Sequence, residues 1–214
     1  AQALEQARRG DEASRLRREK IEAGMQNAAL FQDEAQYLRE TGKAAEALTV
    51  LDRAVDLGIA DDFTLSLRGL VLEDLGRGAE ASRLRREKIE AGTQDAALFH
   101  DEARYLRETG KSAEALVVLD RAGDLGIAND FTLSLRGLVL EDLGHGAEAS
   151  RLRREKIEAG TRNVALFQDE AVYLRKEGKS AKALELLDRA ATVGIANDYT
   201  STLRAQILRN DATT

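Results

Sequence analysis

Internal repetition governs the possible folds of this chain. The string ASRLRREKIEAG occurs three times at intervals of 68 residues, and residues 27–94 differ from residues 95–162 at only nine positions. Glycines divide this interval in half, because they recur every 34 residues in two separate series. One series is Gly24, Gly58, Gly92, Gly126, Gly160 and Gly194; the other is Gly42, Gly76, Gly110, Gly144 and Gly178. A period of this length is typical of helical-repeat proteins, in which each unit buries its apolar face against its neighbours.

Each 34-residue unit is predicted to contain two helices. The chain has no proline and is rich in Ala, Leu, Glu and Arg, which are strong helix formers. The glycines suit the left-handed residue that ends a helix, and an Asx residue that precedes the first helix of every unit can cap its free N–H groups. In the first full unit, we expect helix A near 28–41 and helix B near 44–57. The predicted caps are Asn27, Asp61, Asp95, Asn129, Asn163 and Asn197.

A set of small and apolar residues on these helices resembles the tetratricopeptide repeat (TPR). Helix B of the first unit carries the pattern G-x4-A-x3-L-x2-A, and Phe31, Ala35 and Leu38 stand at the family's large, small and aromatic positions of helix A. The resemblance implies an all-α fold, a right-handed α-solenoid (superhelix) of tandem antiparallel helix pairs. The pattern occurs in the first, third and fifth units as Gly42, Ala47, Leu51 and Ala54; Gly110, Ala115, Leu119 and Ala122; and Gly178, Ala183, Leu187 and Ala190.

Several positions depart from the family. The proline that follows helix B is absent, and Leu38 replaces the usual tyrosine. In the even units, Arg85 and Lys88 replace an apolar and a small residue, as do Arg153 and Lys156. These units match the family mainly through the spacing of their glycines and alanines.

The repeat predicts one solenoid over residues 1–214. A partial unit spans residues 1–26, in which residues 1–10 align with the second half of a helix A. This start is expected of a fragment of a longer protein, and copies this similar are also expected of an engineered array. A capping helix without a helix B follows in residues 197–214. The full units are 27–60, 61–94, 95–128, 129–162 and 163–196.

A solenoid of this family binds ligands along its concave face, which is lined by A helices. We call the A-helix residues expected on that face the outward stripe. The repeats differ from one another at some positions of this stripe, which indicates either adaptation to an extended ligand or neutral drift. Its aromatic and leucine residues are either contact points or packing residues. The stripe consists of Gln32, Gln36, Arg39, Phe63, Ser66, Leu70, His100, Arg104, Arg107, Phe131, Ser134, Leu138, Gln168, Val172 and Arg175. The lysines and asparagine with which some members hold a terminal carboxylate are missing from it.

Two charged patterns follow the same period. Glutamate and arginine alternate every 34 residues, which predicts a ladder of ion pairs between successive A helices: Glu34, Arg68, Glu102, Arg136, Glu170 and Arg204. The arginine runs of the even B helices, such as Arg83 to Lys88, form either an anion-binding patch or a solvated face paired with nearby glutamates.

Catalytic and cofactor motifs are absent from the sequence. There is no cysteine, no phosphate-binding glycine loop and no metal-ligand spacing around His100 or His145. A net charge of −6 disfavours nucleic-acid binding, and no apolar run is long enough for membrane insertion.

We therefore expect a non-enzymatic scaffold, with no cofactor and no metal, that binds a protein or peptide partner. The alternatives are a homo-oligomeric self-assembly module, an accessory array of a larger protein and an RNA-binding repeat. A cytoplasmic location is the default expectation.

Overall fold

The computed structural model describes residues 2–211, with side chains described over residues 9–209. These residues form twelve helices and no strand. Residue 1 and residues 212–214, at the ends of the predicted partial unit and capping helix, lie outside the described residues. The helices are α1 (Gln2–Glu22), α2 (Ala28–Glu40), α3 (Ala44–Asp56), α4 (Asp62–Asp74), α5 (Gly78–Glu90), α6 (Ala96–Glu108), α7 (Ser112–Asp124), α8 (Asp130–Asp142), α9 (Gly146–Glu158), α10 (Val164–Lys176), α11 (Ser180–Thr192) and α12 (Asp198–Asp211).

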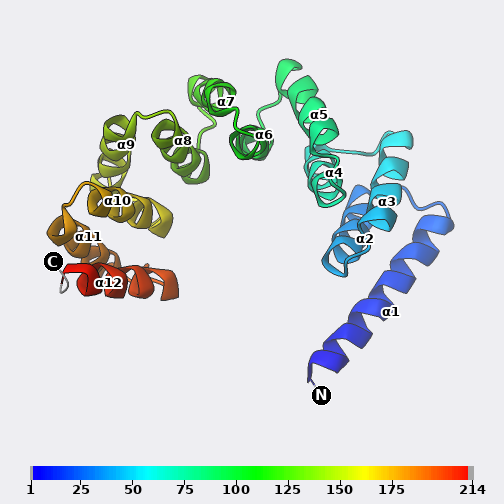
Figure 1. Cartoon of the computed structure of the whole chain (residues 1–214). Coiled ribbons are helices and arrows are strands. Elements are labelled where there is room, and N and C mark those ends of the chain that lie inside the picture. Colours follow the sequence, from blue (N-terminus) through cyan, green and yellow to red (C-terminus); the bar gives the residue numbers. More distant parts are fainter. Residues whose placement is uncertain (1, 212–214) are drawn as a thin grey trace. The chain divides into compact units, whose positions relative to one another are not determined.

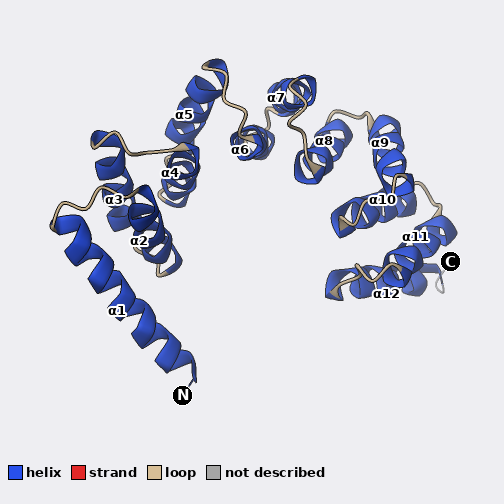
Figure 2. Cartoon of the chain, turned by 180° about the vertical axis from the view of Figure 1, so that it is seen from behind, coloured by secondary structure: helices blue, strands red, loops and turns tan. Residues whose placement is uncertain are grey.

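The chain divides into two compact units, residues 1–98 and residues 99–214. In the first unit, α2 packs on α3 and α4 packs on α5, and α3 joins the two pairs by contacting α4. In the second unit, the pairs α8–α9 and α10–α11 are joined by contacts of α9 with α10, and α12 packs on α11. Figures 1 and 2 show these consecutive pairs from opposite sides. The predicted all-α class of tandem helix pairs is confirmed, whereas one solenoid over residues 1–214 stays a prediction.

The A helices begin at the predicted Asx caps. Asn27 Oδ1 accepts a hydrogen bond of 3.0 Å from the backbone N–H of Ala29, and Asp61 Oδ1 accepts one of 2.8 Å from that of Thr64. Each bond satisfies an N–H that the helix itself leaves free. All six predicted caps accept such a bond: Asn27, Asp61, Asp95, Asn129, Asn163 and Asn197.

The glycines close the helices in the left-handed region. Gly42 has a φ of 77° and lies in the tight turn between α2 and α3. The N–H of Lys43 then donates to the carbonyl of Leu38 over 2.7 Å, which closes the end of α2. All eleven glycines of the two predicted series have positive φ. The first pair of predicted helices is confirmed, because 28–41 and 44–57 correspond to Ala28–Glu40 and Ala44–Asp56.

The first helix departs from this pattern. Residues 1–10 align with the end of a helix A, yet α1 runs from Gln2 to Glu22 without the turn that follows such a helix elsewhere. Gly76 and Gly144 occupy that turn with φ of 72° and 82°, and the equivalent residue is Arg8. A residue with a Cβ strongly disfavours positive φ, so the backbone stays helical through this position.

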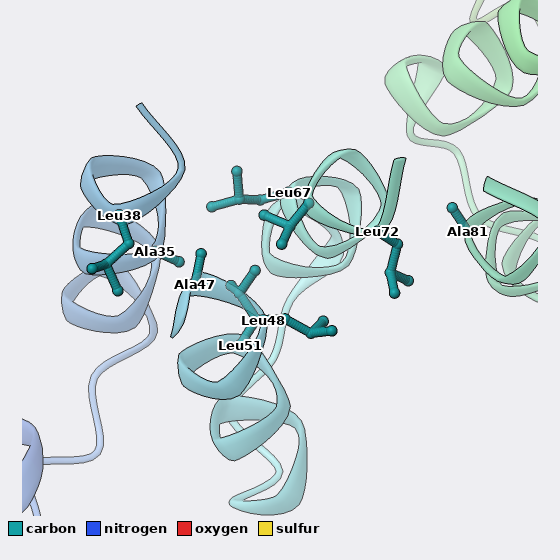
Figure 3. Packing of buried hydrophobic residues seen from close by; sticks show 9 residues of the cluster. Ala35, Leu38, Ala47, Leu48, Leu51, Leu67, Leu72 and Ala81 are labelled. Atoms are coloured by element: carbon teal, nitrogen blue, oxygen red, sulfur yellow. The ribbon is translucent and has the colours of Figure 1, made fainter. Parts of the chain in front are cut away.

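Small and aliphatic residues form the core that α2 shares with α3. Ala35 and Leu38 of α2 meet Ala47 and Leu51 of α3, and all four are buried. Figure 3 shows this cluster, to which Leu67 and Leu72 of α4 also contribute. The alanines let neighbouring helix backbones approach closely, as the family resemblance implies, while the leucines fill the space between repeats.

One exposed glycine weakens α7. Gly123 stands where α3 has Val55, and nothing lies within 4 Å of the position that its Cβ would take. A glycine in a helix costs about 0.5–1 kcal/mol relative to alanine. We therefore expect Gly123→Ala to raise the free energy of unfolding by about that amount in chemical denaturation. The matched change Gly126→Ala should lower it, because Gly126 has a φ of 69°. A stabilising Gly126→Ala, or a destabilising Gly123→Ala, would contradict this assignment.

The predicted ladder between A helices is wrong. Arg68 pairs with Asp52 of α3 over 2.7 Å, and Arg204 pairs with Asp188 of α11 over 2.6 Å. Glu34 is buried and accepts hydrogen bonds of 2.7 Å from Ser14 and Arg18 of α1. These partners belong to the preceding helix B, whose side chains lie nearer than those of the next helix A. The alternating charges of α2, α4, α8, α10 and α12 therefore pair with the helix before each of them, and Arg136 of α8 also lies 3.7 Å from Glu148 of α9.

The arginine run of the even B helices does not form one exposed patch. Arg85 and Arg153 are buried, and the NH2 of Arg85 donates to Glu73 over 2.7 Å. Arg153 NH1 lies 2.6 Å from Glu141 Oε1, although its N–H directions do not meet hydrogen-bond geometry. Both guanidinium groups lie against a glycine of the facing helix A: a Cβ on Gly137 would stand 3.0 Å from Arg153. The outer arginines pair with nearby glutamates, as Arg83 does with Glu87.

Candidate functional site

Part of the outward stripe is occupied by contacts between neighbouring A helices. Gln32 donates from Nε2 to Asp61 Oδ1 over 2.7 Å and to Thr64 Oγ1 over 2.8 Å. Gln168 makes the same pair of bonds, each of 2.8 Å, to Asn197 and Thr200. Each glutamine thus completes the N-cap of the next helix A, which explains why Gln168 is buried.

Further stripe residues bind the far end or the middle of the next helix A. Arg39 Nε lies 2.5 Å from Asp74 Oδ2, and Arg107 Nε lies 2.6 Å from Asp142 Oδ2. These ion pairs are partly exposed, and such pairs contribute about 0–1 kcal/mol. Ser134 donates to Asp169 over 2.9 Å. Five residues of the stripe therefore lie in a seam between neighbouring A helices: Gln32, Arg39, Arg107, Ser134 and Gln168.

The expectation that the whole stripe faces outward needs correction at two positions. Ser66 and Gln168 are buried, and Gln168 lies against the start of the next helix A, where it bonds Asn197 and Thr200. The half-buried members are Gln32, Arg39, Leu70, His100, Arg104, Arg107, Ser134, Leu138, Val172 and Arg175. His100 lies beside Asp101, with 3.3 Å between Nδ1 and Oδ1. Gln36, Phe63 and Phe131 are exposed.

The two exposed phenylalanines are the most accessible apolar groups of the stripe. Phe63 is 55% and Phe131 is 70% exposed, and each stands in the first turn of its helix A. A third aromatic residue of this kind, Tyr199 in the first turn of α12, is 54% exposed and was not among the predicted stripe residues. The step of 68 residues from Phe131 to Tyr199 was the signal that could have identified it.

Ionisable groups in the seam respond to burial and to hydrogen bonds. Burial raises the pKa of the Asp169 carboxyl, and the hydroxyl of Ser134 opposes this change only in part. Burial also acts to raise the pKa of Asp61, but the donors of Thr64 and Gln32 outweigh it, and the net pKa is lowered. Burial therefore determines the direction of the pKa change at Asp169, and hydrogen bonds determine it at Asp61.

The part of the chain that the structure describes contains neither a metal-binding cluster nor a membrane-spanning helix. Within residues 9–209, no group of three or more His, Asp or Glu side chains is arranged so that it could hold a metal ion. None of the helices described is both long and apolar enough to cross a bilayer.

Together, the capped helix pairs, the glycine turns and the alanine contacts define a helical-repeat protein. No protein-family model matches the sequence, and no curated protein matches it.

Solved structures do match the fold. YrrB, described as a TPR protein with an unusual peptide-binding site, is 23% identical with a TM-score of 0.58; the match covers 89% of this chain and 97% of YrrB. A thermophilic TPR protein of Thermus thermophilus is 18% identical with a TM-score of 0.66, over 85% of this chain and 99% of that one. A TPR protein of Parabacteroides merdae is 15% identical with a TM-score of 0.70, over 95% and 87% of the two chains. These likenesses show that the fold is the TPR fold.

Proposed function

We propose that this chain is a non-enzymatic scaffold that binds a peptide or a helix of a partner protein on the exposed part of its A helices. The observation that carries the proposal is the exposure of Phe63 and Phe131 at equivalent places in two repeats. The exposure of an aromatic side chain to water is unfavourable. Aromatic residues are enriched in protein interfaces, where they act as anchors. The fold supports the proposal, because stacked repeats offer extended surfaces to a ligand.

The remaining stripe suits a recognition role around these anchors. Leu70 and Leu138 follow the phenylalanines two helical turns later and are half-buried. The same repeat position holds Gln36 in α2 and Arg104 in α6, so polar and apolar groups alternate at this position of the stripe from α2 to α8. An apolar centre with a polar rim is the usual composition of a protein–protein contact.

The anchor role can be tested against a matched exposed residue on a B helix. Phe131 of α8 is 70% exposed and Val117 of α7 is 69% exposed. We expect Phe131→Glu to lower the capture of a partner from an extract of the source organism by at least about tenfold, since a hot-spot residue contributes about 2 kcal/mol or more. Val117→Glu should leave capture unchanged. Equal capture by both variants would refute the A-helix site.

End-to-end self-assembly is the second candidate, and α12 disfavours it. If α1 of another copy packed on α12 as α9 packs on α8, its Arg17 would take the place of Arg153. Gly137 and Glu141, which make room for Arg153 and pair with it, correspond to Ala205 and Arg209 in α12. The added methyl group and the like charge both oppose this contact.

A further inference from the structure

A groove on the B-helix side of the second unit differs in charge from its counterpart in the first. The groove lies between α9 and α11 above α10, encloses about 470 Å³, and has Ile157, Leu174 and Leu186 among its lining residues. We call it the α9–α11 groove. The same helices in the first unit are α1, α2 and α3, offset by 136 residues.

In the first unit, acidic residues neutralise this position. Arg18 donates to Glu34 over 2.7 Å and lies 3.5 Å from Glu46 of α3, so it spans the space between α1 and α3. The hydroxyl of Tyr37 donates to Asp11 over 2.7 Å. Two cations, Arg18 and Lys43, are therefore balanced by two exposed carboxylates at this end.

In the second unit, both exposed carboxylates are lost. Asp11 corresponds to Ala147, and Glu46 corresponds to Lys182, and both replacements line the α9–α11 groove. Within the described residues, Arg154 consequently has no acidic partner on α11: its Nε lies 3.7 Å from Glu170, and its side chain is 58% exposed, against 42% for Arg18. Arg154 and Lys182 concentrate positive charge at one end of the groove, where Lys179 also lies but pairs with Glu177 over 3.8 Å.

The other charges of the groove offset this concentration only in part. Glu170 is buried beneath it and accepts a hydrogen bond of 2.6 Å from Ser150. Glu185 lies on α11 between Lys182 and Arg189, and Glu158 follows Ile157 on α9. Arg189 donates to the carbonyl of Ile157 over 3.1 Å. The groove thus has one cationic end, an apolar floor and a mixed end.

We infer that the α9–α11 groove binds an acidic segment of a partner protein, in which carboxylates alternate with apolar side chains. The carboxylates pair with Lys182 and Arg154, and the apolar side chains rest on Leu174 and Leu186. Charge complementarity selects this occupant, because like charges that face each other across a groove are relieved by an anion between them. The site is separate from the surface of Phe63 and Phe131, so it does not depend on the function proposed above.

A fluorescein-labelled octapeptide of alternating glutamate and leucine, followed by fluorescence anisotropy, tests the inference. We expect saturable binding that weakens as salt is raised, and at least about a tenfold loss of affinity in Lys182→Glu, which restores the charge found at Glu46 and Glu114. Because Glu is already present at both equivalent positions, this variant should keep the thermal unfolding curve of the parent. Lys182→Ala provides a second variant, with a smaller loss.

The first unit offers a gain-of-binding control. The double change Asp11→Ala and Glu46→Lys introduces the counterparts of Ala147 and Lys182 into the first unit, so the number of peptides bound per chain should rise from one to two in calorimetry. Phe131→Glu should leave peptide binding unchanged. Equal binding of a glutamine–leucine peptide, binding of a single-stranded RNA but not of the acidic peptide, insensitivity to Lys182→Glu or an unchanged stoichiometry in the double variant would each overturn the inference.

Discussion

Replacing Arg153 with alanine is expected to lower the free energy of unfolding by about 3 kcal/mol or more, within the range for breaking one partner out of a buried ion pair. Arg153 is fully buried, and its NH1 lies 2.6 Å from Glu141. The substitution removes that partner from Glu141 and leaves an empty space beside Gly137. Lys176, which lies 3.7 Å from Glu141, limits the loss and sets the expectation at the lower end of the range.

A double variant separates the charge from the volume. Arg153→Met with Glu141→Gln keeps most of the buried volume and removes both charges, and such replacements are often neutral or stabilising. It should therefore unfold closer to the parent than Arg153→Ala does, in guanidinium denaturation and in hydrogen exchange of the α8 and α9 amides. Arg153→Ala with a stability within about 0.5 kcal/mol of the parent would show that the pair does not hold α8 to α9.

Phe167→Ala is the second change with a large expected effect, about 3–5 kcal/mol, since it deletes a buried aromatic side chain and leaves a cavity. Phe167 packs between Ile157 of the preceding helix B and Ala190 of its own. The loss should appear as faster hydrogen exchange in α9, α10 and α11, because in a repeat protein the stability of each unit depends on its neighbours.

The matched variant in the first unit is Phe31→Ala. Phe31 packs between Ile21 and Ala54 in the same way, so its loss should raise exchange in α1, α2 and α3 and leave α10 protected. If Phe31→Ala and Phe167→Ala raised exchange uniformly over the whole chain, unfolding would be a single cooperative event, and the nearest-neighbour expectation would be wrong.

The regular part of the fold was predictable because local residues determine it. Asn27 and Gly42 act through their own backbone and that of the next few residues, so their period alone placed the ends of α2. The buried stripe of Phe31, Ala35 and Leu38 was predictable for the same reason, since the spacing of apolar residues on a helix reveals its buried face.

The candidate binding surface was less predictable because it depends on contacts between helices. Nothing in the helical period of α10 shows that Gln168 reaches the cap of α12 and is thereby buried. Likewise, the sequence predicts Arg153 on the surface, whereas in the structure its guanidinium group lies against Gly137 of the facing helix. The α9–α11 groove could be found only by comparing side chains on three helices at once.

The glutamine bonds between A helices run toward the C-terminus. Gln32 of α2 donates to the cap residue of α4, and Gln168 of α10 stands in the same relation to α12. Between α8 and α10 the bonds run the other way, because Thr161 and Asn163, which lie just before α10, donate to Asp130 in the first turn of α8. When a repeat unravels, the neighbour that loses donors at the start of its helix A therefore depends on which of these residues the repeat holds. Repeats that are nearly identical in sequence are thus coupled in different directions, and local unfolding should spread differently from each of them.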